Sequence, residues 1–228
     1  MTVPRVVARE LSKTYGSNGT AVAAVAEVSF EVAPGEFVAI TGHSGSGKTT
    51  LLSMLGGLAR PSAGRVLFDG ADLYAGGEPA LARHRGEKVG FVFQFASLLP
   101  ALTARENLLL PEQFRPSRRP AEEVQARALE LLSRVGLGDR VDAFPAELSG
   151  GQQRRVAIAR AFMNEPVLVL ADEPTGDLDE ETEAEVMALF RSMNERSGTT
   201  FLLVTHDAGL ARQAGRRLRM ERGRLREG

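Results

Sequence analysis

Residues 42–49 read Gly42-His43-Ser44-Gly45-Ser46-Gly47-Lys48-Thr49, a G-x-x-x-x-G-K-[ST] pattern whose backbone N–H groups typically wrap around nucleotide phosphates. An apolar run at 37–40 precedes this octapeptide, and a leucine-rich segment at 50–55 follows it. This is the strand-to-helix setting that the pattern requires. The stretch therefore predicts an α/β fold with a phosphate-binding loop.

Lysine is rare in this chain, which has 28 basic residues but only Lys13, Lys48 and Lys88 as lysines. An ammonium is a compact point charge that can sit between β- and γ-phosphates, so Lys48 fits a role in binding and catalysis. The hydroxyl of Thr49 would take one position on Mg²⁺. The helix that begins near Lys48 and continues through Thr50 would direct its positive dipole end at the phosphates. We expect a nucleotide bound with Mg²⁺.

Composition limits the other classes of function. The chain has 228 residues, 43% of them hydrophobic, which is enough for one domain that carries a subdomain. Its net charge of −1 argues against nucleic acid as the main partner. The absence of cysteine excludes disulfides and thiolate metal sites, and it fits a reducing compartment. No uncharged apolar stretch approaches the roughly 18 residues of a membrane span, and we expect no signal peptide.

Strand and helix patterns alternate along the chain. Gly and Pro punctuate short β-rich runs at 6–10, 22–32, 35–41 and 65–69. Three further runs, at 88–93, 166–171 and 200–204, are apolar without alternation, which is typical of a parallel sheet covered on both faces. Between about 95 and 165 the period is helical, most clearly in 121–135 with apolar residues at Val124, Ala128, Leu131 and Leu132.

A second motif lies at the end of the apolar run 167–171, where Asp172 and Glu173 follow. Asp172 is placed to hold Mg²⁺, and Glu173 to accept a proton from an attacking water. A solvated acidic turn after a buried strand is the alternative, which the phosphate loop upstream disfavours.

The third motif is Leu148-Ser149-Gly150-Gly151-Gln152-Gln153-Arg154-Arg155. Ser149 is a good N-cap, and the two glycines would expose backbone donors at the start of a helix. These residues match the signature of ATP-binding-cassette (ABC) proteins, and the resemblance extends across most of the chain. Further landmarks follow in the family's order: Tyr15 on the adenine, Gln94 as metal and water sensor, Asp172 and Glu173 as the Mg²⁺-binding and catalytic carboxylates, Asp179 in a dimer-contact loop, and His206 as γ-phosphate sensor.

Each of these residues also has a simpler interpretation. Tyr15 would only pack, Gln94 would cap a strand end, and His206 would be a core histidine. Asp179 would stand at the acidic N-terminus of a helix, where carboxylates interact favourably with the helix dipole. The arginines between 216 and 226 alternate with apolar residues, as expected for an edge hairpin; a contact with anionic lipid is the alternative.

The resemblance implies a P-loop NTPase (RecA-like) core with an N-terminal antiparallel β-subdomain. This core would comprise residues 1–94 and 164–228, and residues 95–163 would form an inserted helical subdomain with the signature. The resemblance also implies a head-to-tail homodimer, in which Ser149, Gly150 and Gly151 of one protomer would close over the ATP on the other's phosphate loop. Hydrolysis of ATP would then release the pair.

Within the family, residues 91–94 with 98–100, and residues 171–179, are most similar to ATPases of the lipoprotein-release and macrolide-export group. Asp177 and Arg154 depart from that group, which often has asparagine and glutamine there. The resemblance implies an ATPase subunit that drives export or mechanotransmission through an integral membrane permease. Phe95 and Leu98 would lie in the groove that receives a permease helix, with core packing as their alternative.

Three other functions stay open: an importer ATPase, a soluble ABC ATPase that acts on ribosomes or DNA repair intermediates, and a nucleotide-binding scaffold without hydrolysis. The presence of Glu173 disfavours the scaffold. We expect a cytoplasmic location at the inner face of the cell membrane, with membrane contact only through the permease.

Overall fold

The computed structural model describes residues 3–16, 21–115, 118–176 and 178–228. The chain divides into two compact units. Unit 1 comprises Met1–Leu81 with Asn194–Gly228, and unit 2 comprises Ala82–Met193. The predicted helical subdomain 95–163 falls inside unit 2.

An antiparallel sheet forms the first part of unit 1. Its strands are β1 (Val6–Tyr15), β2 (Val22–Val32), β4 (Ala63–Phe68) and β5 (Ala71–Asp72), in the order β2-β1-β4-β5. Val6, Ala8 and Leu11 of β1 are buried while residues between them are partly exposed, as expected for a sheet with one covered face. The N-terminal antiparallel subdomain is confirmed.

The remaining strands of unit 1 are β3 (Phe37–Thr41), β8 (Thr200–Thr205), β9 (Arg216–Glu221) and β10 (Arg224–Glu227). Strand β3 pairs in parallel with β8 on one side and with β9 on the other, and β9 and β10 form the predicted antiparallel hairpin. All six residues of β8 are buried, since helix-covered parallel strands bury both faces. In β9, Leu218 and Met220 are buried while Arg217 and Arg219 are exposed.

Two helices of unit 1 begin where parallel strands end. Helix α1 (Lys48–Leu55) follows β3 and buries Leu51, Met54 and Leu55 in the core, while the short α7 (Ala208–Ala211) follows β8. Helix α2 (Gly77–Glu87) connects to the second unit. Both strand ends therefore lead directly into a helix N-terminus.

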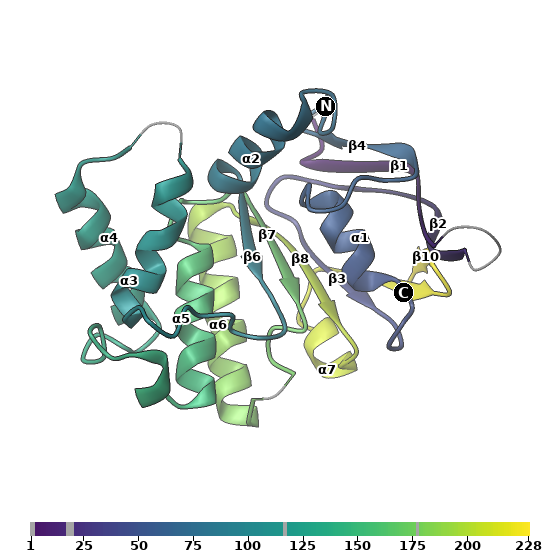
Figure 1. Cartoon of the computed structure of the whole chain (residues 1–228). Helices are drawn as coiled ribbons and strands as arrows, with labels where there is room; N and C mark the ends of the chain where they lie inside the picture. Colours follow the sequence, from purple (N-terminus) through teal and green to yellow (C-terminus); the bar gives the residue numbers. More distant parts are fainter. Residues whose placement is uncertain (1–2, 17–20, 116–117, 177) are drawn as a thin grey trace. The chain divides into compact units, whose positions relative to one another are not determined.

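Unit 2 combines two parallel strands with a group of helices. Strands β6 (Val89–Val92) and β7 (Leu168–Asp172) pair in parallel. The helical elements are α3 (Ala104–Leu109), η1 (Leu110–Phe114), α4 (Ala121–Arg134), η2 (Pro145–Glu147), α5 (Gly150–Ala161) and α6 (Glu180–Ser197). Helix α3 packs against α4 and α5 (Figure 1). The apolar face predicted for α4 is the face that the structure buries.

No helix in the described part of the chain is long and apolar enough to cross a membrane.

Candidate nucleotide site

The phosphate loop of unit 1 has two positions that only glycine can occupy. Gly47 has a φ of +104°, and a Cβ there would lie 2.0 Å from the carbonyl oxygen of Ala24. A Cβ on Gly42 would lie 2.3 Å from the carbonyl oxygen of Met220. Real Cβ atoms do not approach backbone this closely, so the two glycines let the loop pack against β2 and β9.

Lys48 lies at the centre of the loop. Its ammonium is buried and donates to the carbonyl oxygens of Gly42 at 2.7 Å and His43 at 3.1 Å. Helix α1 begins here with no acidic residue in its first turn. The buried hydroxyl of Ser46 has no hydrogen-bond partner among the described residues. A buried cation, a helix N-terminus and an unused donor together fit an anionic ligand such as a triphosphate.

His206 follows β8 at the edge where the phosphate loop follows β3. Thr41 lies opposite Thr205 in the parallel ladder, so the two strands end side by side. The side chain of His206 is exposed, which excludes the core-histidine alternative. Ligand contacts typically gather at the carboxyl ends of parallel strands. Unit 1 therefore brings His206 to the edge that carries the loop.

Tyr15 ends β1 with 48% of its surface exposed, so it is not a core residue. The ammonium of Lys13 lies 5.1 Å from its ring centroid. Stacking of this ring on adenine stays a prediction.

Unit 2 places Gln94 and the paired carboxylates at one sheet edge. Val92 lies opposite Ala171 in the β6–β7 ladder, so the exposed Gln94 and the half-buried Asp172 and Glu173 follow neighbouring strand ends. Glu173 has a φ of +46°, a left-handed conformation that is unfavourable for a residue with a side chain. Such backbone strain clusters at functional sites.

Ser149 caps α5 as predicted. Its hydroxyl accepts from the backbone N–H of Gln152 at 3.2 Å, and its own N–H donates to the side-chain oxygen of Gln152 at 2.9 Å. This capping box leaves Gly150 at the exposed start of the helix, where an added Cβ would meet no atom within 4 Å. We call residues 149–151 the signature turn.

Asp179 directly precedes α6. Its carboxylate accepts from the backbone N–H and the hydroxyl of Thr182, at 2.9 and 2.8 Å, and so caps α6. These hydrogen bonds lower the pKa of the Asp179 carboxyl. A Cβ on Gly151 would lie 3.5 Å from Thr182, so unit 2 brings the turn and the start of α6 together. Asp177 lies outside the described residues.

Arg154 is the residue whose importance sequence reasoning missed. Its side chain is buried, and it donates to the carbonyl oxygens of Phe93 and Gln94. One signal is present in the sequence: Arg154 departs from the family pattern and stands shortly before the apolar residues 156–158 of the same helix.

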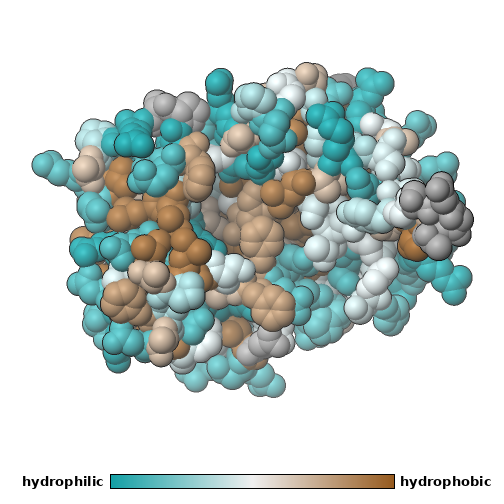
Figure 2. Space-filling view, in the orientation of Figure 1, coloured by the Kyte–Doolittle hydropathy of each residue, from teal (hydrophilic) through white to brown (hydrophobic). Residues whose placement is uncertain are grey.

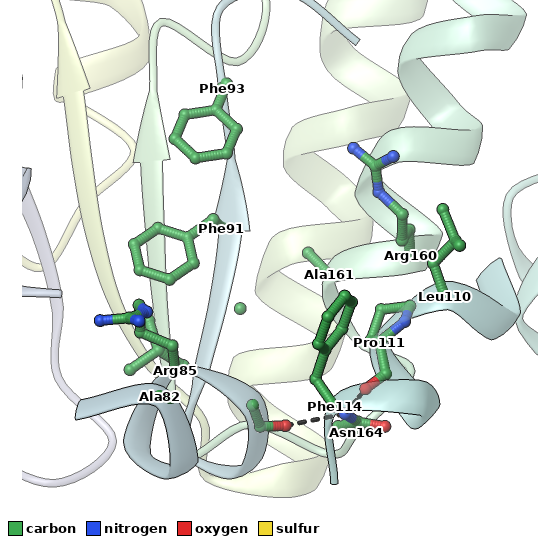
Figure 3. Close-up of a pocket in the computed structure, with 13 residues that line it drawn as sticks. Ala82, Arg85, Phe91, Phe93, Leu110, Pro111, Phe114, Arg160, Ala161 and Asn164 are labelled. Atoms are coloured by element: carbon green, nitrogen blue, oxygen red, sulfur yellow. Dashed lines mark hydrogen bonds between the residues drawn. The ribbon is translucent and has the colours of Figure 1, made fainter. Parts of the chain in front are cut away.

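A groove of about 530 Å³ opens between β6 and the helices of unit 2 (Figure 3). The parallel rings of Phe91 and Phe93, with centroids 5.7 Å apart, form one wall. Residues of η1 and α5, including Phe114 and Arg160, lie across from them. Apolar side chains gather over this part of the surface (Figure 2). Phe95 and Leu98 are not among the residues that line this groove. Phe95 is 70% exposed, which excludes the core alternative for it, and Leu98 is half-buried.

The chain belongs to the ABC transporter family, because the family model for ABC transporters matches residues 25–176. The matched range contains the phosphate loop, Gln94, the signature turn and the paired carboxylates. The chain is an ATP-binding cassette and an ATPase of this family.

Among its relatives is the lipoprotein-releasing system ATP-binding protein LolD of Pseudomonas syringae pv. tomato, 49% identical over 95% of both chains. The macrolide export ATP-binding/permease protein MacB of Syntrophobacter fumaroxidans is 45% identical over 94% of this chain but only 30% of its own length. A solved structure of the cassette MJ0796, a dimer in a post-hydrolysis state with ADP and Pi, is similar with a TM-score of 0.91 and 39% identity, over 97% of this chain and 98% of that one.

Proposed function

We propose that this chain is the ATP-hydrolysing subunit of a transporter complex of the lipoprotein-release or macrolide-export type, working through a membrane permease. The observation that carries the proposal is the phosphate loop, whose glycines are sterically required and whose Lys48 is buried at its centre. Likeness to LolD and MacB over nearly the whole chain supports the transporter type.

In the reaction that we propose, a water molecule attacks the γ-phosphorus of ATP and the bond to the β,γ-bridging oxygen breaks, giving ADP and phosphate. Glu173 orients the water and accepts its proton. Lys48 stabilises charge on the phosphates, while His206 and Gln94 contact the γ-phosphate end. Tyr15 stacks on the adenine. Most of the rate enhancement in such a reaction comes from positioning and electrostatics.

The proposed metal is Mg²⁺, which would neutralise charge on the phosphates. Its ligands from this chain would be the hydroxyl of Thr49, the carboxylate of Asp172 and the amide oxygen of Gln94. All three are hard oxygen donors. The described residues hold no cluster of three His, Asp or Glu side chains that could bind a metal alone. This fits Mg²⁺, which typically binds one or two carboxylates together with substrate phosphates.

We propose that two copies associate head to tail around two ATP molecules. The signature turn of one copy would donate backbone N–H groups to the γ-phosphate held by the other copy, as the exposed start of α5 permits. Such pairing is isologous and closes with two-fold symmetry. The dimeric state of the MJ0796 cassette supports it.

The proposed occupant of the groove in unit 2 is a short helix of the permease. Phe114 and Phe93, which both line the groove, are 73% and 44% exposed, and exposed aromatic side chains at a hollow typically mark an interaction site. Arg85 and Arg160 at the same groove would pair with an acidic residue on such a helix. Through this contact the chain would be held at the inner face of the cell membrane.

Copurification separates the transporter from the soluble alternatives. If a tagged chain captures a membrane protein with several spans, an exporter or importer subunit is supported, and the identity of that protein decides between them. Cosedimentation with ribosomes would contradict the transporter proposal.

The catalytic proposal is tested with Glu173→Gln. We expect turnover to fall at least about 100-fold while ATP affinity is kept, because only the proton acceptor is lost. Glu165→Gln is the matched control, since Glu165 is exposed and has a similar left-handed φ of +52° but lies outside the proposed site. Retained turnover in Glu173→Gln, measured as phosphate release, would contradict the assignment.

A further inference from the structure

Helix α5 holds a buried arginine that the proposed chemistry does not use. Arg154 is 5% exposed, and it is followed on the helix by the buried Val156, Ala157 and Ile158. Its guanidinium donates to the carbonyl oxygens of Phe93 and Gln94, which lie 61 and 60 residues earlier in the chain. A buried cation requires such acceptors, so this contact fixes the helix to the backbone of the loop.

A second arginine of α5 holds the same loop further along. Arg160 donates to the carbonyl oxygens of Ala96 and Ser97, each at 3.0 Å. Burial lowers the pKa of the Arg160 guanidinium. Ser97 has a left-handed φ of +47°, a conformation that its surroundings must hold in place. We call residues 93–97 the arginine-held loop.

The other end of α5 is the signature turn. The helix has 12 residues, with the Ser149 capping box at its start and Arg160 near its end. Hydrogen bonds within an α-helix make such a short segment stiff. The turn and the arginine-held loop are therefore attached to one rod.

We propose that Arg154 is a positioning residue which makes the signature turn and Gln94 move as one body. The inference rests on the proposed function, in which the turn contacts ATP held by the partner copy while Gln94 contacts the chain's own ATP. Closure of the turn over one nucleotide would then set Gln94 against the other. The two sites of the dimer would be coupled through α5, and such coupling is reciprocal.

Arginine suits this role because its planar fork can donate to two carbonyl groups at once. Lysine at the same position can reach one carbonyl group well, and methionine fills similar space without any donor. Arginine, lysine and methionine at this position therefore form a series in which the side chain can donate to two, one or no carbonyl groups.

The test is a double-mutant cycle between Arg154→Met and Gln94→Ala, read as phosphate release. We expect Arg154→Met to lower kcat roughly 10- to 100-fold, because misplacement of a group such as Gln94 by about 1 Å can reduce the rate this much. The KM for ATP should change less than about threefold. The double variant should be no slower than the slower single variant, because residues that act through one another are not additive. Arg154→Lys should recover part of the rate.

Arg155→Met is the matched control. Arg155 is the next residue on α5, and it donates to Val135 and Glu185 rather than to the loop. Arg155→Met should keep kcat within about twofold, although it loses side-chain hydrogen bonds as Arg154→Met does and should lose a similar amount of stability. Thermal unfolding of all variants checks the fold, and Arg154→Lys replaces Arg154→Met in the cycle if the latter does not fold.

The outcomes separate this inference from the proposed function. A normal kcat in the Arg154 variant, a change in KM alone, or losses that multiply in the double variant would overturn the positioning role while leaving Gln94 in the site. If Gln94→Ala itself has no effect, the role proposed for Gln94 is wrong, and the inference is overturned with it.

Discussion

The phosphate loop and the arginine-held loop both lie at the carboxyl end of a parallel strand, but different parts of the chain shape them. The phosphate loop is closed from within, because Lys48 donates to carbonyl groups only five and six residues away. The arginine-held loop is fixed by α5, about 60 residues later in the chain. A loop of the first kind can be recognised in a sequence as a motif, whereas a loop of the second kind depends on the assembled fold.

The largest effect is expected inside the phosphate loop, for Gly47→Ala. The new Cβ would lie 2.0 Å from the Ala24 carbonyl oxygen at a φ of +104°. We expect loss of ATP binding and a decrease of about 2–4 kcal/mol in the free energy of unfolding. Gly45→Ala is the control, since its φ of +75° is also left-handed but no atom lies within 4 Å; it should cost about 1 kcal/mol. Equal costs in denaturant unfolding would show that steric contact does not shape this loop.

A smaller effect is expected at the signature turn, for Ser149→Ala. Loss of the cap should cost about 1 kcal/mol of unfolding free energy, and turnover should fall at least about tenfold because a proposed phosphate contact is disturbed. Thr103→Ala is matched to it, because Thr103 forms the same kind of capping box with Glu106 at α3. That variant should lose similar stability while turnover changes less than about twofold. Equal turnover in the two variants would show that Ser149 only caps α5 and would contradict a phosphate contact of the signature turn.

The smallest effect concerns pH. Burial opposes ionisation of Glu112, but the hydrogen bonds and charge of Arg119, with Arg115, outweigh it and lower the pKa of this carboxyl below 4.5. Its contribution to stability is therefore fully present above pH 4.5 and is lost as the pH falls through the folded-state value.

Glu112→Gln should accordingly remove up to about 1 kcal/mol of unfolding free energy at pH 7, and the difference from the unmodified chain should shrink in acid. Arg154 donates to neutral carbonyl groups, so the loss caused by Arg154→Lys should stay constant over the same range. The losses of unfolding free energy in Glu112→Gln and Arg154→Lys are both measured by denaturant unfolding, at intervals of about one pH unit between pH 3 and 7. A loss in Arg154→Lys that also shrinks in acid would contradict carbonyl groups as its main acceptors.

Local patterns predicted most of the sheet. The predicted strand 22–32 is β2 (Val22–Val32), and the predicted helix 121–135 is α4 (Ala121–Arg134). Both have a periodic apolar pattern between clear breaks, so each segment carries its own signal. The strand expected at 6–10 continues to Tyr15, because register shifts let β1 keep pairing with β2 beyond the regular alternation.

Other features needed the structure. Helix α3 was not predicted as a separate element, because its six residues are too few to show a helical period. The pattern Thr103-x-x-Glu106 is nevertheless a capping-box signal for a helix N-terminus. The strained backbone of Glu173 and the contacts of Arg154 involve geometry that no spacing in the sequence records. Candidate site residues were thus found by motif, while the residues that hold them were not.

In the proposed dimer, each ATP is shared between the phosphate loop of one copy and the signature turn of the other. Two variants test it: Lys48→Ala, which lacks the loop cation, and Gly150→Asp, at an exposed position where an added Cβ meets no atom within 4 Å. Each alone should be inactive, since each spoils both sites of its own dimer.

Mixing the two purified variants and measuring phosphate release is the most direct measurement. In a mixed dimer, one site combines the intact loop of the Gly150→Asp copy with the intact turn of the Lys48→Ala copy. With random pairing, half of the dimers are mixed and each has one intact site of two, so the mixture should recover up to about a quarter of normal turnover, the full quarter if the intact site works without the other. A mixture that stays as inactive as its components, although the two variants are shown to associate, would contradict the shared site.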